Sequence, residues 1–201
     1  MSLVALCVGC GVASAQSPTV VGSGSDESFL VIESSLFSAT LVYDYKYTYN
    51  PSELLDTHDM LVAIDAADPN ISFDFINYGT VVDPNYFLNA VTYNTVTATN
   101  TPSPDYSPYW VQWVSGGEGG YPVAGPIDSG TWSYGSGISA PYRTLAPESW
   151  DGFIYNDGIL PPSVSPVIPI PEASTGCLIL AGVLLLIPFS KKCLPKKISV
   201  R

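Results

Sequence analysis

The single histidine of the chain limits the catalysis that its side chains can perform. His58 is the only imidazole among 201 residues, and neither a Gly-x-Ser-x-Gly turn nor a cysteine between residues 16 and 170 accompanies it. A Ser-His-Asp or Cys-His arrangement would have to be built on this residue alone. A lone histidine near the apolar face of a helix is more often a partly buried polar residue than a ligand. We therefore predict that the protein is not an enzyme.

One group of acidic residues has the spacing of a cation site. Asp65, Asp68 and Asn70 form a D-x-x-D-x-N cluster of hard oxygen donors, the ligands that Ca²⁺ prefers. The cluster lacks the glycine and the bidentate glutamate of an EF-hand at their spacings. We expect Asp68 and Asn70 to cap a helix end instead, and we expect no metal and no cofactor. Other carboxylates lie in turns, where they are usually solvated even if two of them reach glycosidase spacing.

Aromatic side chains are the remaining candidates for ligand contact, because all four tryptophans and all thirteen tyrosines lie between residues 16 and 170. Alternation along a strand at 109–114 places Trp110 and Trp113 on opposite sheet faces, so one of them can be exposed. An exposed indole beside amides can hold a sugar ring or an apolar ligand, whereas in a cysteine-free domain large aromatics are also core material, the interpretation that we favour. The candidate ligand aromatics are Trp110, Trp113, Trp132 and Trp150.

The elements that must position these residues are mostly strands. From Phe37 to Tyr49 every odd position is apolar or aromatic, which is typical of a strand with one buried face. Pro- and Gly-rich turns separate shorter strand-like segments at 29–33, 71–76, 90–99, 109–114, 131–134 and 150–155. We predict a mainly β fold, a single antiparallel β-rich domain over residues 16–160.

One short helix is predicted near 52–67. Ser52 can act as its N-cap, Glu53 lies in the first turn, and Asp68 and Pro69 end it. The apolar residues Leu54, Leu61 and Ile64 fall on one face.

The domain is acidic. Residues 16–170 contain 17 acidic residues and only two basic ones, Lys46 and Arg143, which gives a formal charge of −15. Such a surface repels nucleic acid and anionic head groups, so we expect no nucleic-acid partner. Because the domain has no cysteine, its stability must come from burial rather than disulfides.

The last 35 residues place a short motif, an apolar span and a basic end in that order. Ala173 to Ser190 holds eighteen uncharged residues, and a helix of that length spans about 27 Å, close to the hydrocarbon thickness of a bilayer. Five of the seven basic residues follow, Lys191, Lys192, Lys196, Lys197 and Arg201. We predict a C-terminal transmembrane helix over 174–190, with the basic end in the cytoplasm and the preceding domain outside.

The motif before the span is Pro171, Glu172, Ala173. Together with the span and the basic end, residues 171–201 resemble the PEP-CTERM sorting signal of Gram-negative bacteria. The usual motif of that family is Pro-Glu-Pro, and Ala173 replaces its second proline. The resemblance implies recognition and cleavage near the motif by an exosortase, a membrane-embedded cysteine protease. The alternative is an ordinary anchor helix that is never cleaved.

Residues 1–15 have the pattern of a secretory signal peptide. An apolar run from Leu3 to Val12 leads to Ala13, Ser14 and Ala15, so the mature chain would begin at Gln16. No basic residue precedes the run, and we expect a start codon further upstream. Residues 161–170 form a Pro-rich linker, which we expect to be a stiff spacer.

The order of segments in the domain has a second, more distant likeness. The segments DMLVAIDAADP, ISFDFINYGT, YWVQWV and WDGFIYNDG are similar to those of uncharacterised exported β-rich bacterial domains, some of them distantly similar to the β-rich C-terminal domain of cobalamin carriers. No motif is specific enough to transfer a ligand residue.

Two functions are consistent with these observations. The first is an exported surface or extracellular-matrix protein with a structural or adhesive role, whose partners are the membrane, an exosortase-type protease and exopolysaccharide. The second is a module that binds a glycan or a small cofactor through exposed aromatics. Binding of one ligand class would distinguish the second from the first.

Overall fold

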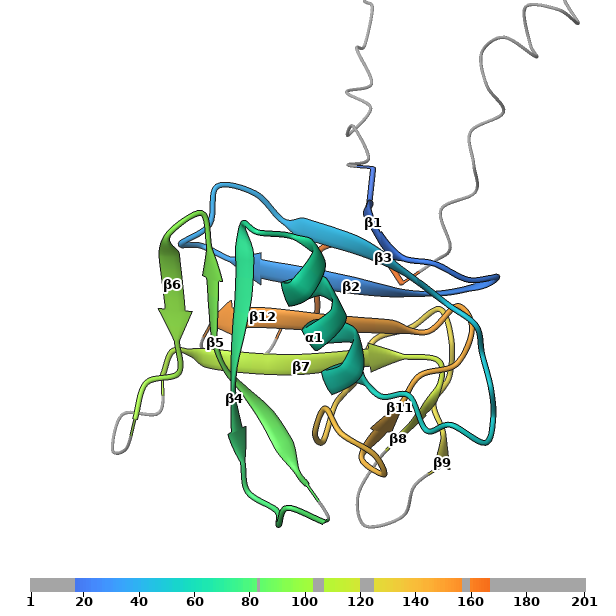
Figure 1. The fold of residues 1–201 in the computed structure, drawn as a ribbon. Helices are drawn as coiled ribbons and strands as arrows, with labels where there is room; N and C mark the ends of the chain where they lie inside the picture. The colour runs from blue at the N-terminus through green and yellow to red at the C-terminus, as the bar shows by residue number, and fades with distance from the viewer. Residues whose placement is uncertain (1–16, 83, 103–106, 120–124, 157–159, 167–201) are drawn as a thin grey trace, which may run out of the picture. The chain divides into compact units, whose positions relative to one another are not determined.

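The computed structural model describes residues 17–82, 84–102, 107–119, 125–156 and 160–166 (Figure 1). The chain divides into two units, Met1–Val167 and Ile168–Arg201, and the described residues all belong to the first. The predicted signal peptide and its cleavage residues Ala13, Ala15 and Gln16, the motif Pro171, Glu172, Ala173 and the predicted span 174–190 lie outside them. Within the described ranges, no helix has the length and apolarity needed to cross a membrane.

The described domain is mainly β with one helix, as predicted. In chain order its elements are β1 (Thr19–Gly22), β2 (Asp26–Ser34), β3 (Leu41–Tyr47), α1 (Thr57–Ala67), β4 (Ile71–Asn77), β5 (Tyr86–Tyr93), β6 (Val96–Thr99), β7 (Tyr109–Ser115), β8 (Glu118–Gly119), β9 (Gly125–Pro126), β10 (Ser133–Tyr134), β11 (Arg143–Thr144) and β12 (Trp150–Asn156).

The strands of the described residues form three sheets. The largest has six strands in the order β1-β3-β2-β12-β7-β10, and two smaller sheets have the orders β4-β5-β6 and β11-β8-β9. Most neighbouring strands are antiparallel, but β1 with β3 and β2 with β12 are parallel. At the centre of the large sheet, Phe29 of β2 lies opposite Trp150 of β12, so two segments far apart in the sequence are adjacent (Figure 1).

The helix begins four residues later than an N-cap at Ser52 would place it. Its N-cap is Asp56, whose Oδ1 accepts a hydrogen bond from Asp59 N at 2.9 Å, while Asp59 Oδ2 accepts one from Asp56 N at 3.2 Å. This reciprocal capping box satisfies two backbone N–H groups that the first turn leaves unpaired. Ser52 instead lies in a turn, where its N–H donates to Asn50 Oδ1 at 3.1 Å.

The predicted strand at 90–99 is two strands. β5 and β6 are joined by Asn94 and Thr95, both with positive φ, at 47° and 73°. Positive φ at both central residues is the geometry of a two-residue hairpin turn, whose twist matches that of the flanking strands. The strand predicted at 37–49 is confined to β3, and the one predicted at 131–134 to the two residues of β10.

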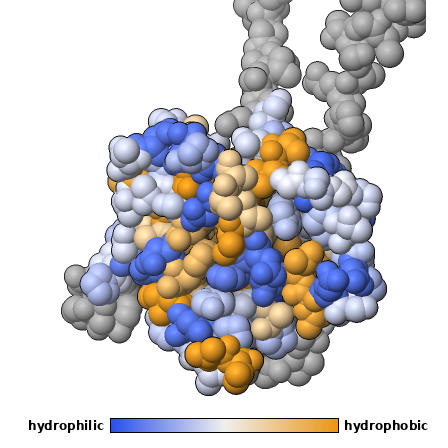
Figure 2. Space-filling model, viewed as in Figure 1, coloured by the Kyte–Doolittle hydropathy of each residue, from blue (hydrophilic) through white to orange (hydrophobic). Residues whose placement is uncertain are grey.

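Both faces of the large sheet are covered, which explains why so many aromatics are buried. On one face α1 and the β4-β5-β6 sheet pack on Leu30, Ile32 and Phe153. On the other face Phe29, Val31 and Trp150 form a cluster with Trp132 and Val164. On the side drawn in Figure 2, hydrophobic atoms of the described residues form separate patches between hydrophilic ones.

The described part of the predicted linker packs on the domain. We call residues 160–166 the C-terminal strap. Ser163 donates from its N and Oγ to Glu33 Oε1, at 2.9 and 2.5 Å, and Val164 O accepts from Trp132 Nε1 at 2.9 Å. Gly152 leaves room for it, because a Cβ there would overlap the ring of Pro162. Residues 160–166 are therefore part of the domain and not a spacer beyond it.

Candidate functional site

Three of the four tryptophans predicted as ligand aromatics are core residues, and the fourth packs against the core. Trp110, Trp113 and Trp150 are buried, and Trp132 is half-buried. Trp110 and Trp113 do lie on opposite faces of β7, as the alternation predicts, but each face is covered, so neither indole is exposed. Trp110 Nε1 donates to Ala98 O at 2.9 Å, and Trp150 stacks on Phe29 with 4.4 Å between ring centroids. The core interpretation is confirmed for the three buried tryptophans.

A cleft with a volume of about 410 Å³ is the strongest candidate for a binding site. It lies between the β4–β5 hairpin and the part of β7 next to β10. Four of its aromatic side chains are exposed, which are Tyr78 at 69%, Phe87 at 38%, Tyr109 at 39% and Tyr134 at 58%. Trp110 also lines the cleft from its buried position in the core.

Two amide side chains, those of Gln112 and Asn100, are among the residues that line this cleft. Gln112 Oε1 accepts from Gly137 N at 3.1 Å, and Gln112 Nε2 donates to Asp151 Oδ1 at 3.3 Å. Asn100 Nδ2 donates to Leu88 O at 2.8 Å, and Asn100 Oδ1 accepts from Trp110 N at 2.6 Å. Each amide is thus held in one orientation by two partners, which also assigns its oxygen and nitrogen.

The cleft exists because β10 covers only part of the edge of β7. Ser133 and Tyr134 pair with Val114 and Trp113, and the chain then turns away at Gly135, whose N–H donates to Gln112 O at 2.9 Å. A Cβ at position 135 would overlap the Gln112 side chain, so glycine is required for this approach. Tyr109 to Val111 are left without a strand partner on that side among the described residues.

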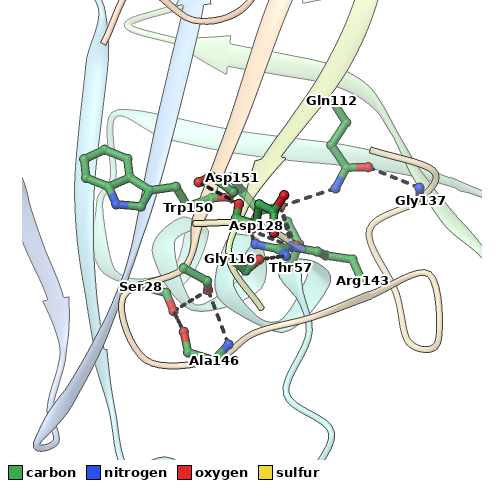
Figure 3. Close-up of polar contacts among 12 residues, drawn as sticks. Ser28, Thr57, Gln112, Gly116, Asp128, Gly137, Arg143, Ala146, Trp150 and Asp151 are labelled. Atoms are coloured by element: carbon green, nitrogen blue, oxygen red, sulfur yellow. Dashed lines mark hydrogen bonds and ion pairs between the residues drawn. The ribbon is translucent and has the colours of Figure 1, made fainter. Parts of the chain in front are cut away.

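Gln112, which lines the cleft, is connected to a buried ion pair (Figure 3). Arg143 and Asp151 are both fully buried, and Arg143 Nη2 lies 2.8 Å from Asp151 Oδ2. Arg143 Nε contacts both carboxylate oxygens at 3.1 Å, and its Nη1 and Nη2 donate to Gly116 O at 2.5 Å and Trp150 O at 3.1 Å. Thr57 Oγ1 donates to Asp151 Oδ1 at 2.8 Å, which ties the start of α1 to β12.

This network compensates the cost of burying two charges. A buried ion pair is tolerated when both partners make further hydrogen bonds, and here the carboxylate has Thr57 and Gln112 while the guanidinium has two backbone carbonyls. Because the charges of Arg143 and Asp151 neutralise each other, we assign the two residues a structural role. Asp151 also fixes the side chain of Gln112, which lines the cleft.

A second polar group lies at the start of α1. Ligand atoms of Asp56, His58 and Asp59 lie within 4.8 Å of one another. Asp56 already accepts backbone hydrogen bonds on both oxygens, from Asp59 N and Ala140 N, each at 2.9 Å. Burial raises the pKa of Asp56 to about 6, which disfavours the charged form that a cation would need at lower pH. Both oxygens of the Asp56 carboxylate are therefore already used by backbone hydrogen bonds.

His58 is a partly buried residue, as predicted. Its ring stacks on Tyr86 with 4.1 Å between centroids and an interplanar angle of 9°, and it meets the edge of Phe75. Burial lowers the pKa of His58, since the low-dielectric surroundings disfavour imidazolium.

Asp68 and Asn70 act at the end of α1 and in the turn that follows it, as predicted. Asp68 is the C-cap of α1, and its Oδ1 accepts from Asn70 N at 2.9 Å while its Oδ2 accepts from Tyr43 Oη at 2.9 Å. Asp65 Oδ2 accepts from Phe73 N at 2.9 Å. The three side chains therefore stabilise the junction between α1 and β4.

Sequence reasoning named none of the four exposed aromatics of the cleft as a candidate ligand residue. Tyr109 and Tyr134 belong to segments that were predicted as strands, at 109–114 and 131–134, but Tyr78 and Phe87 lie beside a turn and carry no distinguishing motif. The only available signal was that Phe87 alternates with buried Leu88 in a strand.

No protein-family model, curated protein or solved structure matches this chain.

Proposed function

We propose that the protein is exported and displayed at the surface of a Gram-negative cell by its C-terminal sorting signal, and that its domain has a structural or adhesive role in the exopolysaccharide envelope. The observation that carries this proposal is the order of the last 31 residues: Pro171-Glu172-Ala173, the apolar span 174–190 and the basic end. An amino-terminal signal peptide over residues 1–15 would start export, and the apolar helix would stop it.

The domain has properties that suit such a location. It contains no cysteine between residues 16 and 170, so its fold does not depend on the redox state of the compartment. Both basic residues of the domain are paired, Arg143 with Asp151 and Lys46 with Glu27 and Asp44. The remaining formal charge is strongly negative, which favours a hydrated, soluble surface and disfavours nucleic acid.

The strap supports the division between domain and signal. The described residues of the strap end at Pro166, five positions before Pro171, and they are bonded to the domain through Ser163 and Val164. Cleavage near the motif would therefore remove the span without removing a segment that the core requires.

The proposal is tested by the intact mass of the full-length protein expressed in a Gram-negative host that contains an exosortase. We expect an extracellular species that begins at Gln16 and ends near Pro171. The Glu172→Ala variant should accumulate at full length in the membrane, because the motif is then incomplete. The Glu118→Ala variant, which changes an exposed carboxylate of the domain, should be processed normally.

Two results would contradict the sorting proposal. Normal processing of Glu172→Ala would show that the protease does not recognise the motif. A wild-type species that still carries Lys191 to Arg201 in every fraction would mean a permanent anchor helix in place of a sorting signal.

A further inference from the structure

We propose that the cleft lined by Tyr78, Phe87, Tyr109 and Tyr134 is a binding site for one or two rings of a neutral carbohydrate. This site involves none of the four tryptophans as an exposed platform. It also stands independently of the sorting tail, because every residue that forms it lies in the described domain. Its volume of about 410 Å³ falls in the range of about 300–1,000 Å³ found for small-molecule sites.

Three of the four exposed rings that line the cleft are held by an aromatic neighbour. Tyr134 stacks on buried Trp113 with 4.1 Å between centroids, and Tyr78 meets the edge of Phe87 at 5.4 Å. Each ring therefore loses little rotational freedom when a ligand covers its remaining face, which lowers the entropic cost of binding. Aromatic rings combine apolar area with, in tyrosine, a hydroxyl that can meet a polar substituent.

The polar groups of the cleft match the hydroxyls of a sugar. An amide nitrogen carries two hydrogens, and the structure commits one partner each to Gln112 Nε2 and Asn100 Nδ2. The second hydrogen of each amide can be offered to a ligand oxygen. Because both amides are fixed by protein partners, they are oriented before the ligand arrives.

The charge of the cleft selects a neutral ligand. None of the described residues that line it is charged, although the domain as a whole has a formal charge of −15. An anionic sugar would find no cation to pair with and would approach through a negative field. A cationic ligand would find no carboxylate in the lining.

The edge of β7 argues against an extended peptide as the occupant. A peptide that adds a strand needs free backbone donors and acceptors on the edge. Asn100 Oδ1 already accepts from Trp110 N, and Gly135 N already donates to Gln112 O. Side-chain and loop contacts thus occupy the positions that a new strand would use.

The test is titration calorimetry of the full-length protein in detergent micelles with maltotriose, cellotriose and tri-N-acetylchitotriose, and with trigalacturonate as the anionic comparison. We expect saturable binding of at least one neutral trisaccharide, accompanied by a change in tryptophan fluorescence because Trp110 lines the cleft. Trigalacturonate should bind at least about tenfold more weakly.

Variants then locate the site. Tyr78→Ala and Tyr109→Ala should each weaken binding by up to about tenfold through loss of one stacking surface. Tyr49→Ala removes a tyrosine that is 41% exposed and lies outside the cleft lining, and this control should bind as the wild type does. Circular dichroism of each variant shows whether it is folded, and two independent cleft variants are used in case one is not.

Three outcomes would overturn the proposal. They are no binding of any of the three neutral sugars at millimolar concentration, trigalacturonate binding as tightly as they do, or unchanged affinity in both cleft variants. None of these results bears on processing of the tail, so failure here is distinct from failure of the sorting proposal.

Discussion

Arg143 is a charged residue that the core of the domain accommodates. Arg143 is one of only two basic residues between positions 16 and 170, yet it is fully buried against Asp151. Nothing in the sequence around it, SAPYRTLAP, distinguishes it from a solvated arginine in a turn. Its burial depends on a carbonyl from position 116 and a carboxylate from β12, which only the tertiary fold brings together. A local pattern cannot predict such a residue.

Replacing the buried cation should destabilise the domain strongly. The Arg143→Leu variant leaves Asp151 charged and unpaired in the core, a change that costs about 3–5 kcal/mol. Lys46→Ala breaks the partly exposed pairs with Glu27 and Asp44 and should cost less than about 1 kcal/mol. Urea denaturation measures both. Equal losses in the two variants would refute the structural role assigned to Arg143.

The exposed aromatics of the cleft could not be predicted from local sequence either. Tryptophan attracts attention in a sequence because it is rare and because indoles stack on sugars. In this domain, however, the six-stranded sheet is covered on both faces, so the largest rings are placed in the core. The exposed rings of the cleft are smaller and lie at hairpin ends and strand edges. Exposure depends on which layers cover a strand, and one strand's own alternation does not reveal that.

At the scale of elements, periodicity located strands better than it defined their ends and partners. The segments predicted at 29–33, 71–76, 109–114 and 150–155 fall within β2, β4, β7 and β12. Short strands such as β1, β8, β9 and β11 have too few residues to show a period. The 90–99 segment appeared continuous because Asn94 and Thr95 are not the Asn-Gly pair that marks most two-residue hairpins. Helix α1 starts late because its capping box begins at Asp56.

The β5–β6 hairpin offers a stabilising substitution. Thr95 is β-branched and has a φ of 73°, a conformation that glycine adopts without steric cost. We expect Thr95→Gly to raise the free energy of unfolding by about 1 kcal/mol. Thr97→Gly changes a residue of β6 that bonds Thr92 through their hydroxyls, and it should destabilise instead. Thermal denaturation distinguishes the two signs, and a loss of stability in Thr95→Gly would contradict the turn assignment.

At the scale of the whole molecule, the uneven distribution of charge affects how the free energy of unfolding changes with pH. Both cations of the domain are engaged in ion pairs, so the surplus of carboxylates is left to repel itself. Added to this general repulsion is Asp56, whose pKa is raised by burial to about 6 from 3.8. His58 has the opposite effect, because burial lowers its pKa and the folded state then resists protonation.

Acidification should therefore stabilise the wild type relative to Asp56→Asn. As the pH falls from 7 through 6 towards 4, the folded carboxyl takes up a proton while the unfolded one stays ionised, so the contribution of Asp56 to the free energy of unfolding rises, on the order of 2 kcal/mol. Asparagine is also a good N-cap but does not titrate. Urea denaturation across this range gives the difference, in which the His58 contribution cancels. Parallel pH profiles of the two proteins would contradict the raised pKa.

The parallel pairing of β2 with β12 has a consequence for how the chain is made. The central strands of the large sheet come from residues 26–34 and 150–156, so its middle stays open until nearly the whole domain has been synthesised. Contacts this distant in sequence slow folding, because a long loop must close before they form. A chain that is threaded N-terminus first through a membrane pore would thus remain unfolded, and able to pass, until β12 emerges. In the export that we propose, late closure of the sheet would keep the protein competent for translocation without a separate device to hold it open.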